Sequence, residues 1–200
     1  MSSHGYESGL RADLLDTWRA IFERQKAFAE HAFDQLDDDQ FFAVLTPGLN
    51  SVAVIARHMG SNMLSRWTDF LTSDGEKPSR DRDAELEPFP EDMAPEQRAR
   101  ARAQVMDTWS RGWSTLLATL ESLTEADLSR TVTIRSAPHS VHAAIARQLD
   151  HYAFHVGQIN VIARQLVGTD QWKWFTLPPG GTRAFNEQMR RRHAPPESRP

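Results

Sequence analysis

Residues 140–168 read SVHAAIARQLDHYAFHVGQINVIARQLVG and form the most regular segment of the chain. Ser140 is a favourable helix N-cap and Gly168 a favourable stop, so the sequence predicts a helix over 140–167. Its inward row recurs at steps of three and four and comprises Val141, Ile145, Gln148, Leu149, Tyr152, Val156, Ile159, Ala163 and Leu166. Such an amphipathic helix requires partner helices to cover this row.

Two histidines lie at the edge of that row. His151 and His155 are four residues apart, which sets them roughly 40° apart on a helix that turns about 100° per residue. Both imidazoles can therefore point at one atom. His142 lies about 180° from His151, on the other side of the helix, and His139 precedes the helix. The helix thus favours His151 and His155 as a ligand pair for a metal ion.

The same periodicity predicts three more long helices, over about 10–34, 51–72 and 95–122. Pro95 suits the first turn of the last of these, and Gly112 within it permits a close approach of a neighbouring helix. Shorter elements are a helical turn in 37–44, a turn at 124–127, an extended piece over 131–135 and a helix over 182–191. Four long amphipathic helices with little strand predict an all-α fold, a four-helix bundle.

The connections divide the chain further. Residues 73–94 form a long irregular crossover, which permits a non-adjacent connection within the bundle. A loop over 171–181 carries three aromatic residues and is expected to pack over one end of the bundle. We expect a disordered N-terminal lead over 1–9, one bundle domain over 10–191 and a disordered tail over 192–200.

Composition excludes several function classes. The 200 residues fit one domain, and the net charge of −4 offers no broad positive field for nucleic acid. The absence of cysteine excludes disulfides, thiolate zinc clusters and a cysteine nucleophile. The polar N-terminus lacks a signal-peptide core, and no apolar run reaches the ~20 residues of a membrane helix. We therefore expect a cytoplasmic protein that binds neither nucleic acid nor membrane.

A metal held by the histidine pair needs a third ligand, and His58 is the best candidate. It falls at the edge of the apolar row of the helix over 51–72, beside Ile55 and Asn62. Three imidazoles plus an open position are typical of a catalytic metal site. No HExxH protease motif, di-iron ExxH pair, phosphate loop or nucleophile elbow accompanies them. From the residues alone, packed and hydrogen-bonded histidines remain an alternative to a metal site.

The charged run over 80–83, Arg-Asp-Arg-Asp, also has two interpretations. It is either a solvated loop, as surface charges usually are, or a self-paired clamp beside a site.

Three stretches resemble the DinB/YfiT-like superfamily, and within it an uncharacterised subfamily. They are residues 55–70 (IARHMGSNMLSRWTDF), residues 74–78 (DGEKP) with 80–83, and residues 147–159 (RQLDHYAFHVGQI). The resemblance spans about residues 10–187. It implies an up-down-down-up four-helix bundle, often dimeric, with a divalent metal held by three histidines that map onto His58, His151 and His155.

The resemblance also implies a chemistry. Members with assigned activity are similar to thiol-dependent S-transferases and a mycothiol-dependent isomerase, in which the metal activates a low-molecular-weight thiol such as bacillithiol or mycothiol. We therefore expect a metal-dependent enzyme, a thiol S-transferase or a hydrolase, acting on a small molecule as a homodimer. The alternative is a non-catalytic dimeric bundle with a structural or vestigial metal.

Four side chains are candidates for supporting the site. Asn62 lies one turn after His58, and Gln158 one turn after His155 on nearly the same bearing. Asp150 and Arg66 are weaker candidates for the same role. The three imidazoles suit zinc, nickel or another divalent ion, so the sequence does not select the metal.

Overall fold

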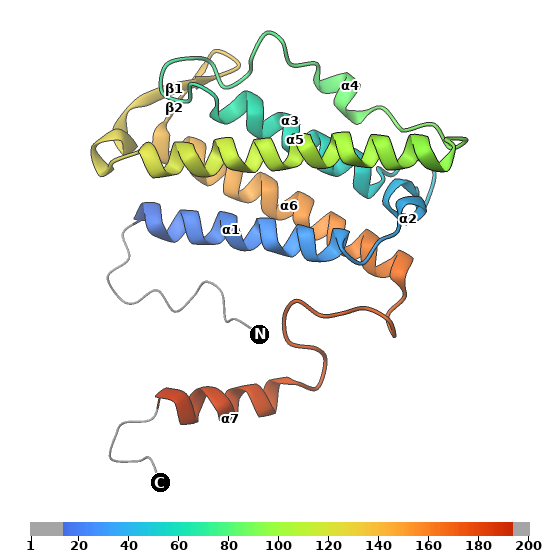
Figure 1. The fold of residues 1–200 in the computed structure, drawn as a ribbon. Coiled ribbons are helices and arrows are strands. Elements are labelled where there is room, and N and C mark those ends of the chain that lie inside the picture. Colours follow the sequence, from blue (N-terminus) through green and yellow to red (C-terminus); the bar gives the residue numbers. More distant parts are fainter. Residues whose placement is uncertain (1–13, 194–200) are drawn as a thin grey trace.

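The chain is mostly helical, as a computed structural model that describes residues 14–193 shows (Figure 1). The four long helices predicted from periodicity are confirmed as α1 (Leu14–Phe33), α3 (Val52–Trp67), α5 (Pro95–Ser122) and α6 (Val141–Val167). Helix α3 packs against α5 and α6, and α1 packs against α6 and α5. In Figure 1, α1 and α6 run in one direction and α3 and α5 in the other. Since α3 and α5 are parallel neighbours, the chain must cross back between them, which explains the long connection.

Shorter elements connect the long helices. They are α2 (Asp38–Phe42), α4 (Arg82–Leu86), the 3-10 helix η1 (Glu125–Ser129), the strands β1 (Thr131–Ile134) and β2 (Ala137–Ser140), and α7 (Thr182–His193). Among the described residues, no helix is both long enough and apolar enough to cross a membrane. The predicted lead over 1–9 lies outside the described residues, as does the tail beyond His193.

Aromatic side chains fill the space between the long helices. Trp67, Trp113 and Tyr152 are fully or almost fully buried and surround Phe22, each with ring centroids within 6.4 Å of it. The Tyr152 hydroxyl donates to Asn62 Oδ1 at 2.9 Å and accepts from Trp67 Nε1 at 3.2 Å. These bonds join α6 to α3 inside the core. They therefore fix the register of the two helices that carry the three candidate histidines.

Two glycines let α3 and α5 touch. A Cβ on Gly112 would lie 2.8 Å from the Gly60 carbonyl oxygen, and a Cβ on Gly60 would lie 2.9 Å from the backbone of Thr108 and Trp109. The neighbour is backbone in both cases, so it cannot rotate away. The close approach expected at Gly112 is confirmed.

Gly112→Ala should therefore lower the free energy of unfolding. We expect a net loss on the order of 1–2 kcal/mol, because overpacking the crossing outweighs the better helix propensity of alanine. Gly157→Ala on α6 is the matched control, since a Cβ there meets nothing within 4 Å. Denaturant unfolding that shows equal effects for the two variants would contradict the close packing.

The structure corrects the predicted end of α3. The helix ends at Trp67 rather than at 72, because Thr68 has an extended C-cap conformation (φ −65°, ψ 128°). Asp69 then adopts a left-handed φ of 49°. The following crossover also contains a short helix, α4, where the sequence predicted irregular chain.

A hairpin precedes α6. The extended piece predicted over 131–135 is confirmed as β1, which pairs antiparallel with β2. Arg135 and Ser136 form the two-residue turn with φ of 53° and 62°, a conformation that hairpins usually reserve for Asn or Gly. The second strand was not predicted, because this turn lacks those residues and β2 contains Pro138.

Asp74 fastens the hairpin turn to the crossover. Its carboxylate accepts hydrogen bonds from the backbone N–H groups of Glu76 at 2.7 Å, Arg135 at 2.8 Å and Ser136 at 2.7 Å. Burial acts to raise the pKa of Asp74, but these hydrogen bonds outweigh it and lower the pKa to about 2. The ionised carboxylate is thus the form that the fold stabilises.

This lowered pKa should make stability fall in acid. The contribution of Asp74 is complete above its unfolded pKa of about 3.9 and is lost as the pH falls through about 2. Because the side chain is partly exposed, we expect a contribution on the order of 1 kcal/mol. Urea unfolding of wild type and Asp74→Asn should differ most near neutral pH and converge near about pH 2. A difference that is independent of pH would contradict the role of the charge.

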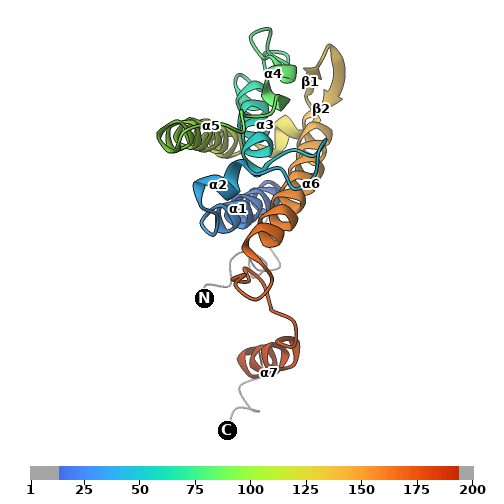
Figure 2. The same cartoon turned by 90° about the vertical axis from the view of Figure 1, so that its right-hand side faces the viewer.

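The C-terminal aromatic loop covers one end of the long helices, as predicted. Trp172 is buried in the core, and the Phe175 ring lies 4.4 Å from that of Phe28 on α1. The Arg164 guanidinium stacks over Trp174. Beyond this loop, α7 lies apart from the long helices in both views (Figures 1 and 2) and has no buried residue.

Candidate metal centre

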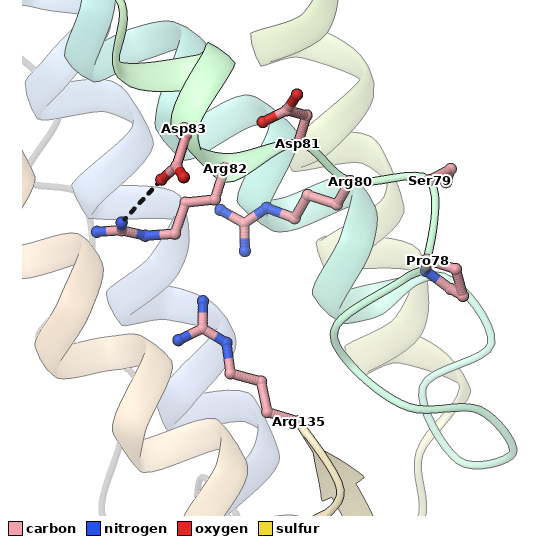
Figure 3. Close-up of a pocket in the computed structure, with 7 residues that line it drawn as sticks. All are labelled: Pro78, Ser79, Arg80, Asp81, Arg82, Asp83 and Arg135. Atoms are coloured by element: carbon pink, nitrogen blue, oxygen red, sulfur yellow. Dashed lines mark ion pairs between the residues drawn. The ribbon is translucent and has the colours of Figure 1, made fainter.

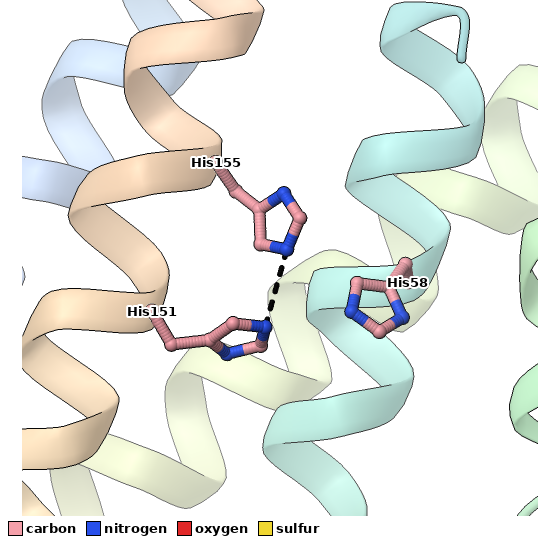
Figure 4. Close-up of side chains that lie close together, drawn as sticks. All are labelled: His58, His151 and His155. Carbon is pink, nitrogen blue, oxygen red and sulfur yellow. Dashed lines mark hydrogen bonds between the residues drawn. The ribbon is translucent and has the colours of Figure 1, made fainter. Parts of the chain in front are cut away.

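Three imidazoles from two helices meet at one point. His58 comes from α3, and His151 and His155 come from adjacent turns of α6 (Figure 4). One ring nitrogen of each lies within 4.8 Å of the others. The Nε2 atoms of His151 and His155 are 3.1 Å apart. The side chains that the helical spacing selected therefore converge, and they could hold a metal ion.

Hydrogen bonds at the outer edges of two rings orient them. His58 Nδ1 lies 2.9 Å from Glu85 Oε2, and His155 Nδ1 lies 2.8 Å from Gln158 Oε1. A carboxylate accepts but does not donate, so His58 Nδ1 carries the proton and its Nε2 keeps the lone pair. The same holds for His155 if Gln158 accepts through its amide oxygen. Outer partners of this kind usually support metal-binding histidines.

His151 differs from the other two. Its Nδ1 is buried and has no hydrogen-bond partner within residues 14–193. The ring packs against that of Tyr152, with centroids 5.3 Å apart. Its orientation therefore depends on packing against the core rather than on an outer acceptor.

A buried ion-pair chain supports His58. Glu85 accepts from Arg80 Nε at 2.8 Å and from Arg80 Nη2 at 2.7 Å, a bidentate pair, while its Oε2 also accepts from His58. The side chains of His58, Glu85 and Arg80 are only 5%, 7% and 4% exposed. Arg80 Nη1 continues the chain to Glu76 Oε2 at 3.0 Å. This chain ties the crossover between α3 and α5 to the histidine cluster.

The electrostatics of the chain favour an ionised Glu85. Burial acts to raise its pKa, but hydrogen bonds from His58 and Arg80 outweigh it, and the pKa lies below its ordinary value. Burial also acts to lower the pKa of Arg80, but the hydrogen bonds to Glu85 outweigh it and raise that pKa. Glu85 therefore stays an acceptor that can hold the His58 tautomer.

The histidine pair is held neutral. Burial, with the nearby His155, His58, Arg66 and Arg80, lowers the pKa of His151 to about 3. Burial also lowers the pKa of His155, and the bond to Gln158 only partly opposes it. Neutral imidazole is the form that binds a metal ion, so near pH 7 both rings present a lone pair.

The donor set fits a catalytic type of divalent metal site. Within residues 14–193, no further His, Asp or Glu joins the three-histidine group. Three imidazole ligands leave a position for water or substrate on a four-coordinate ion. A fourth protein ligand, which would have indicated a structural site, is not found in the described chain.

The remaining predicted residues have different places. Gln158 contacts His155 directly, whereas Asn62 accepts from Tyr152 and supports the α3–α6 contact instead. Arg66 is buried, lies 3.7 Å from Glu76 and helps to lower the pKa of His151. Asp150 is exposed on α6 and is not brought to the site.

Within the charged run over 80–83, one residue is a clamp beside the site and another is solvated. Arg80 is the buried clamp, whereas the Asp83 side chain is 100% exposed. Sequence reasoning missed Glu85, the residue that Arg80 clamps. The only sequence feature that pointed to Glu85 was the charged run itself. The Asp81 side chain caps α4 and thereby starts the short helix on which Glu85 lies.

Comparison with known proteins places the chain in a family. No curated protein and no solved structure gives a significant match. A family model described as "Protein of unknown function (DUF1572)" matches residues 10–181. That region includes all three histidines, Glu85 and Arg80. Because the match covers most of the sequence, the chain belongs to the DUF1572 family.

Proposed function

We propose that this protein is a DinB/YfiT-like, divalent-metal-dependent enzyme that activates a low-molecular-weight thiol, or water, at His58, His151 and His155. The observation that carries this proposal is the convergence of three imidazoles without a fourth protein ligand in the described chain. The opposite directions of α1 and α6 relative to α3 and α5 support an up-down-down-up four-helix bundle, the arrangement expected for that superfamily.

A divalent ion bound here would lower the pKa of a thiol or water in its open position. The chain's own residues set the geometry. Glu85 holds the His58 tautomer, Gln158 orients His155, and the Tyr152–Asn62 bond keeps α6 in register with α3. The chain has no cysteine, so a thiol nucleophile at this site would come from a co-substrate. A thiol S-transferase acting on a small molecule is the reaction class that fits these features best.

Cobalt substitution tests the proposal, because thiolate bound to Co²⁺ gives a charge-transfer absorption band. Cobalt-loaded protein titrated with 2-mercaptoethanol should develop a saturable band, and EDTA should abolish it. The exposed His142 supplies a control, since His142→Ala should leave the band unchanged. Full cobalt occupancy without any thiolate band would refute thiol activation and leave water as the activated group.

A second candidate is a non-catalytic dimeric bundle with a structural metal. Phe154 and Val161 favour its dimeric arrangement, which the first proposal shares, because they lie two turns apart on α6 and are 61% and 70% exposed. Pairing this face with a second copy would bury both side chains. Light scattering should then report a dimer that Phe154→Glu with Val161→Glu converts to a monomer. A wild-type monomer would remove this candidate.

A further inference from the structure

A pocket of about 580 Å³ lies on the crossover, lined by residues 78–83 and by Arg135 of the hairpin turn. Figure 3 shows the guanidinium groups of Arg80, Arg82 and Arg135 gathered on one side of it. These cations come from two separate segments, the crossover and the β1–β2 turn. The pocket is therefore a place where three positive side chains meet.

Glu85 and Glu76 engage Arg80, but the carboxylates near this pocket leave N–H donors of Arg82 and Arg135 unused. The Asp81 side chain points away in Figure 3 and accepts from the Ala84 N–H at 3.0 Å. Asp83 is fully exposed and 3.9 Å from Arg82, which is beyond hydrogen-bond length. Glu76 lies 3.5 Å from Arg135. Each guanidinium has five N–H donors, so Arg82 and Arg135 keep donors for an incoming group.

The hairpin holds Arg135 in place. Its backbone N–H and that of Ser136 both donate to Asp74, whose carboxylate also binds the crossover. Arg135 adopts a left-handed φ of 53° in this tight turn. The position of its backbone is thus fixed, which reduces the entropy cost of binding a ligand.

The pocket adjoins the three histidines. Arg80 lines the pocket and shares Glu85 with His58, through contacts of 2.7 Å and 2.9 Å. On the other side, the charge of Arg82 is close enough to act on His155. A molecule that contacts Arg80 in the pocket would therefore be linked to His58, a candidate metal ligand, through Arg80 and Glu85.

We propose that this pocket binds an oxyanion, a carboxylate or a phosphate, of the substrate or thiol that reacts at the three-histidine centre. Planar guanidinium groups bind both kinds of oxyanion through paired N–H donors. The pocket lies within the size range of small-molecule sites. The link to the reaction rests on the proposed function, whereas anion binding by Arg82 and Arg135 does not.

NMR titration of the full, EDTA-treated chain tests anion binding without the metal. Inorganic phosphate and acetate are the two probes, and they distinguish a phosphate group from a carboxylate. At least one should bind saturably and shift the amide signals of residues 78–83 and 135. The double variant Arg82→Gln, Arg135→Gln should weaken that binding at least tenfold. Arg82→Lys with Arg135→Lys should recover only part of it, because the charge remains but the paired donors are lost.

Arg111→Gln is the matched control, because Arg111 is 65% exposed on α5 and pairs with Asp107 in the same loose way. It should leave anion binding unchanged. Absence of saturable binding of both ions, or equal binding by wild type and the double variant, would overturn the proposal. Metal content of the same variants, measured before EDTA treatment, separates the two ideas: the double variant should contain as much metal as wild type, and a wild type that neither contains nor takes up a divalent metal but still binds the anion would refute only the proposed function.

Discussion

His151→Ala should abolish high-affinity metal binding while the protein stays folded. It removes one of three converging ligands, so the affinity should fall by more than the 10- to 100-fold that follows loss of an outer partner. The fold should survive, because burial lowers the pKa of His151 to about 3 and the neutral ring leaves no buried charge unpaired when removed. Competition with a metallochromic indicator would measure the affinity, and circular dichroism the fold.

His142→Ala is the control for this substitution. His142 is on the same helix, is exposed and contacts the Leu128 carbonyl rather than the cluster. It should bind metal as wild type does. If both variants bind as wild type does, the three histidines are not the ligands.

Glu85→Gln should reduce both stability and metal affinity. Glu85 is the only carboxylate that Arg80 engages with two nitrogens among the described residues, and both side chains are under 10% exposed. Removing one charge of a buried pair typically costs about 3–5 kcal/mol. Glu76 still contacts Arg80, so we expect the lower end of that range. Metal affinity should fall about 10- to 100-fold, because the charged carboxylate that fixes the His58 tautomer is replaced by a neutral amide, whose single oxygen must serve both His58 and Arg80.

Asp83→Asn is the matched control, two residues away on the same short helix. Its fully exposed carboxylate makes only a 3.9 Å contact with Arg82, so stability should change by less than about 0.5 kcal/mol. Unfolding in urea and metal titration would measure both effects. If Glu85→Gln is as mild as Asp83→Asn, the ion-pair chain does not hold the site.

The sequence predicted what depends on local periodicity. The helix over 140–167 and the edge positions of His151 and His155 follow from steps of three and four residues, and His58 follows from the same reasoning on its own helix. That the two helices meet in the right register depends on contacts between distant residues. The Tyr152–Asn62 bond supplies such a contact between α6 and α3, and the Gly60–Gly112 crossing sets α3 against α5; no pattern within one helix encodes such pairs.

The elements that were missed lack a local signal. Nothing in the spacing links Glu85 to His58, because they are 27 positions apart and the chain between them leaves the helix and returns through the crossover. The end of α3 was misplaced because Thr68 and Asp69 leave the helix without a glycine or proline. The second hairpin strand was missed because Arg135 and Ser136 make a turn that usually needs Asn or Gly.

Elemental analysis of the purified, chelator-free protein tests the metal centre most directly. Wild type should carry about one divalent metal ion per chain, as one three-histidine site requires, and His151→Ala should carry almost none. The result that would contradict the metal centre is a wild-type protein that contains no divalent metal and takes up none with at least roughly micromolar affinity.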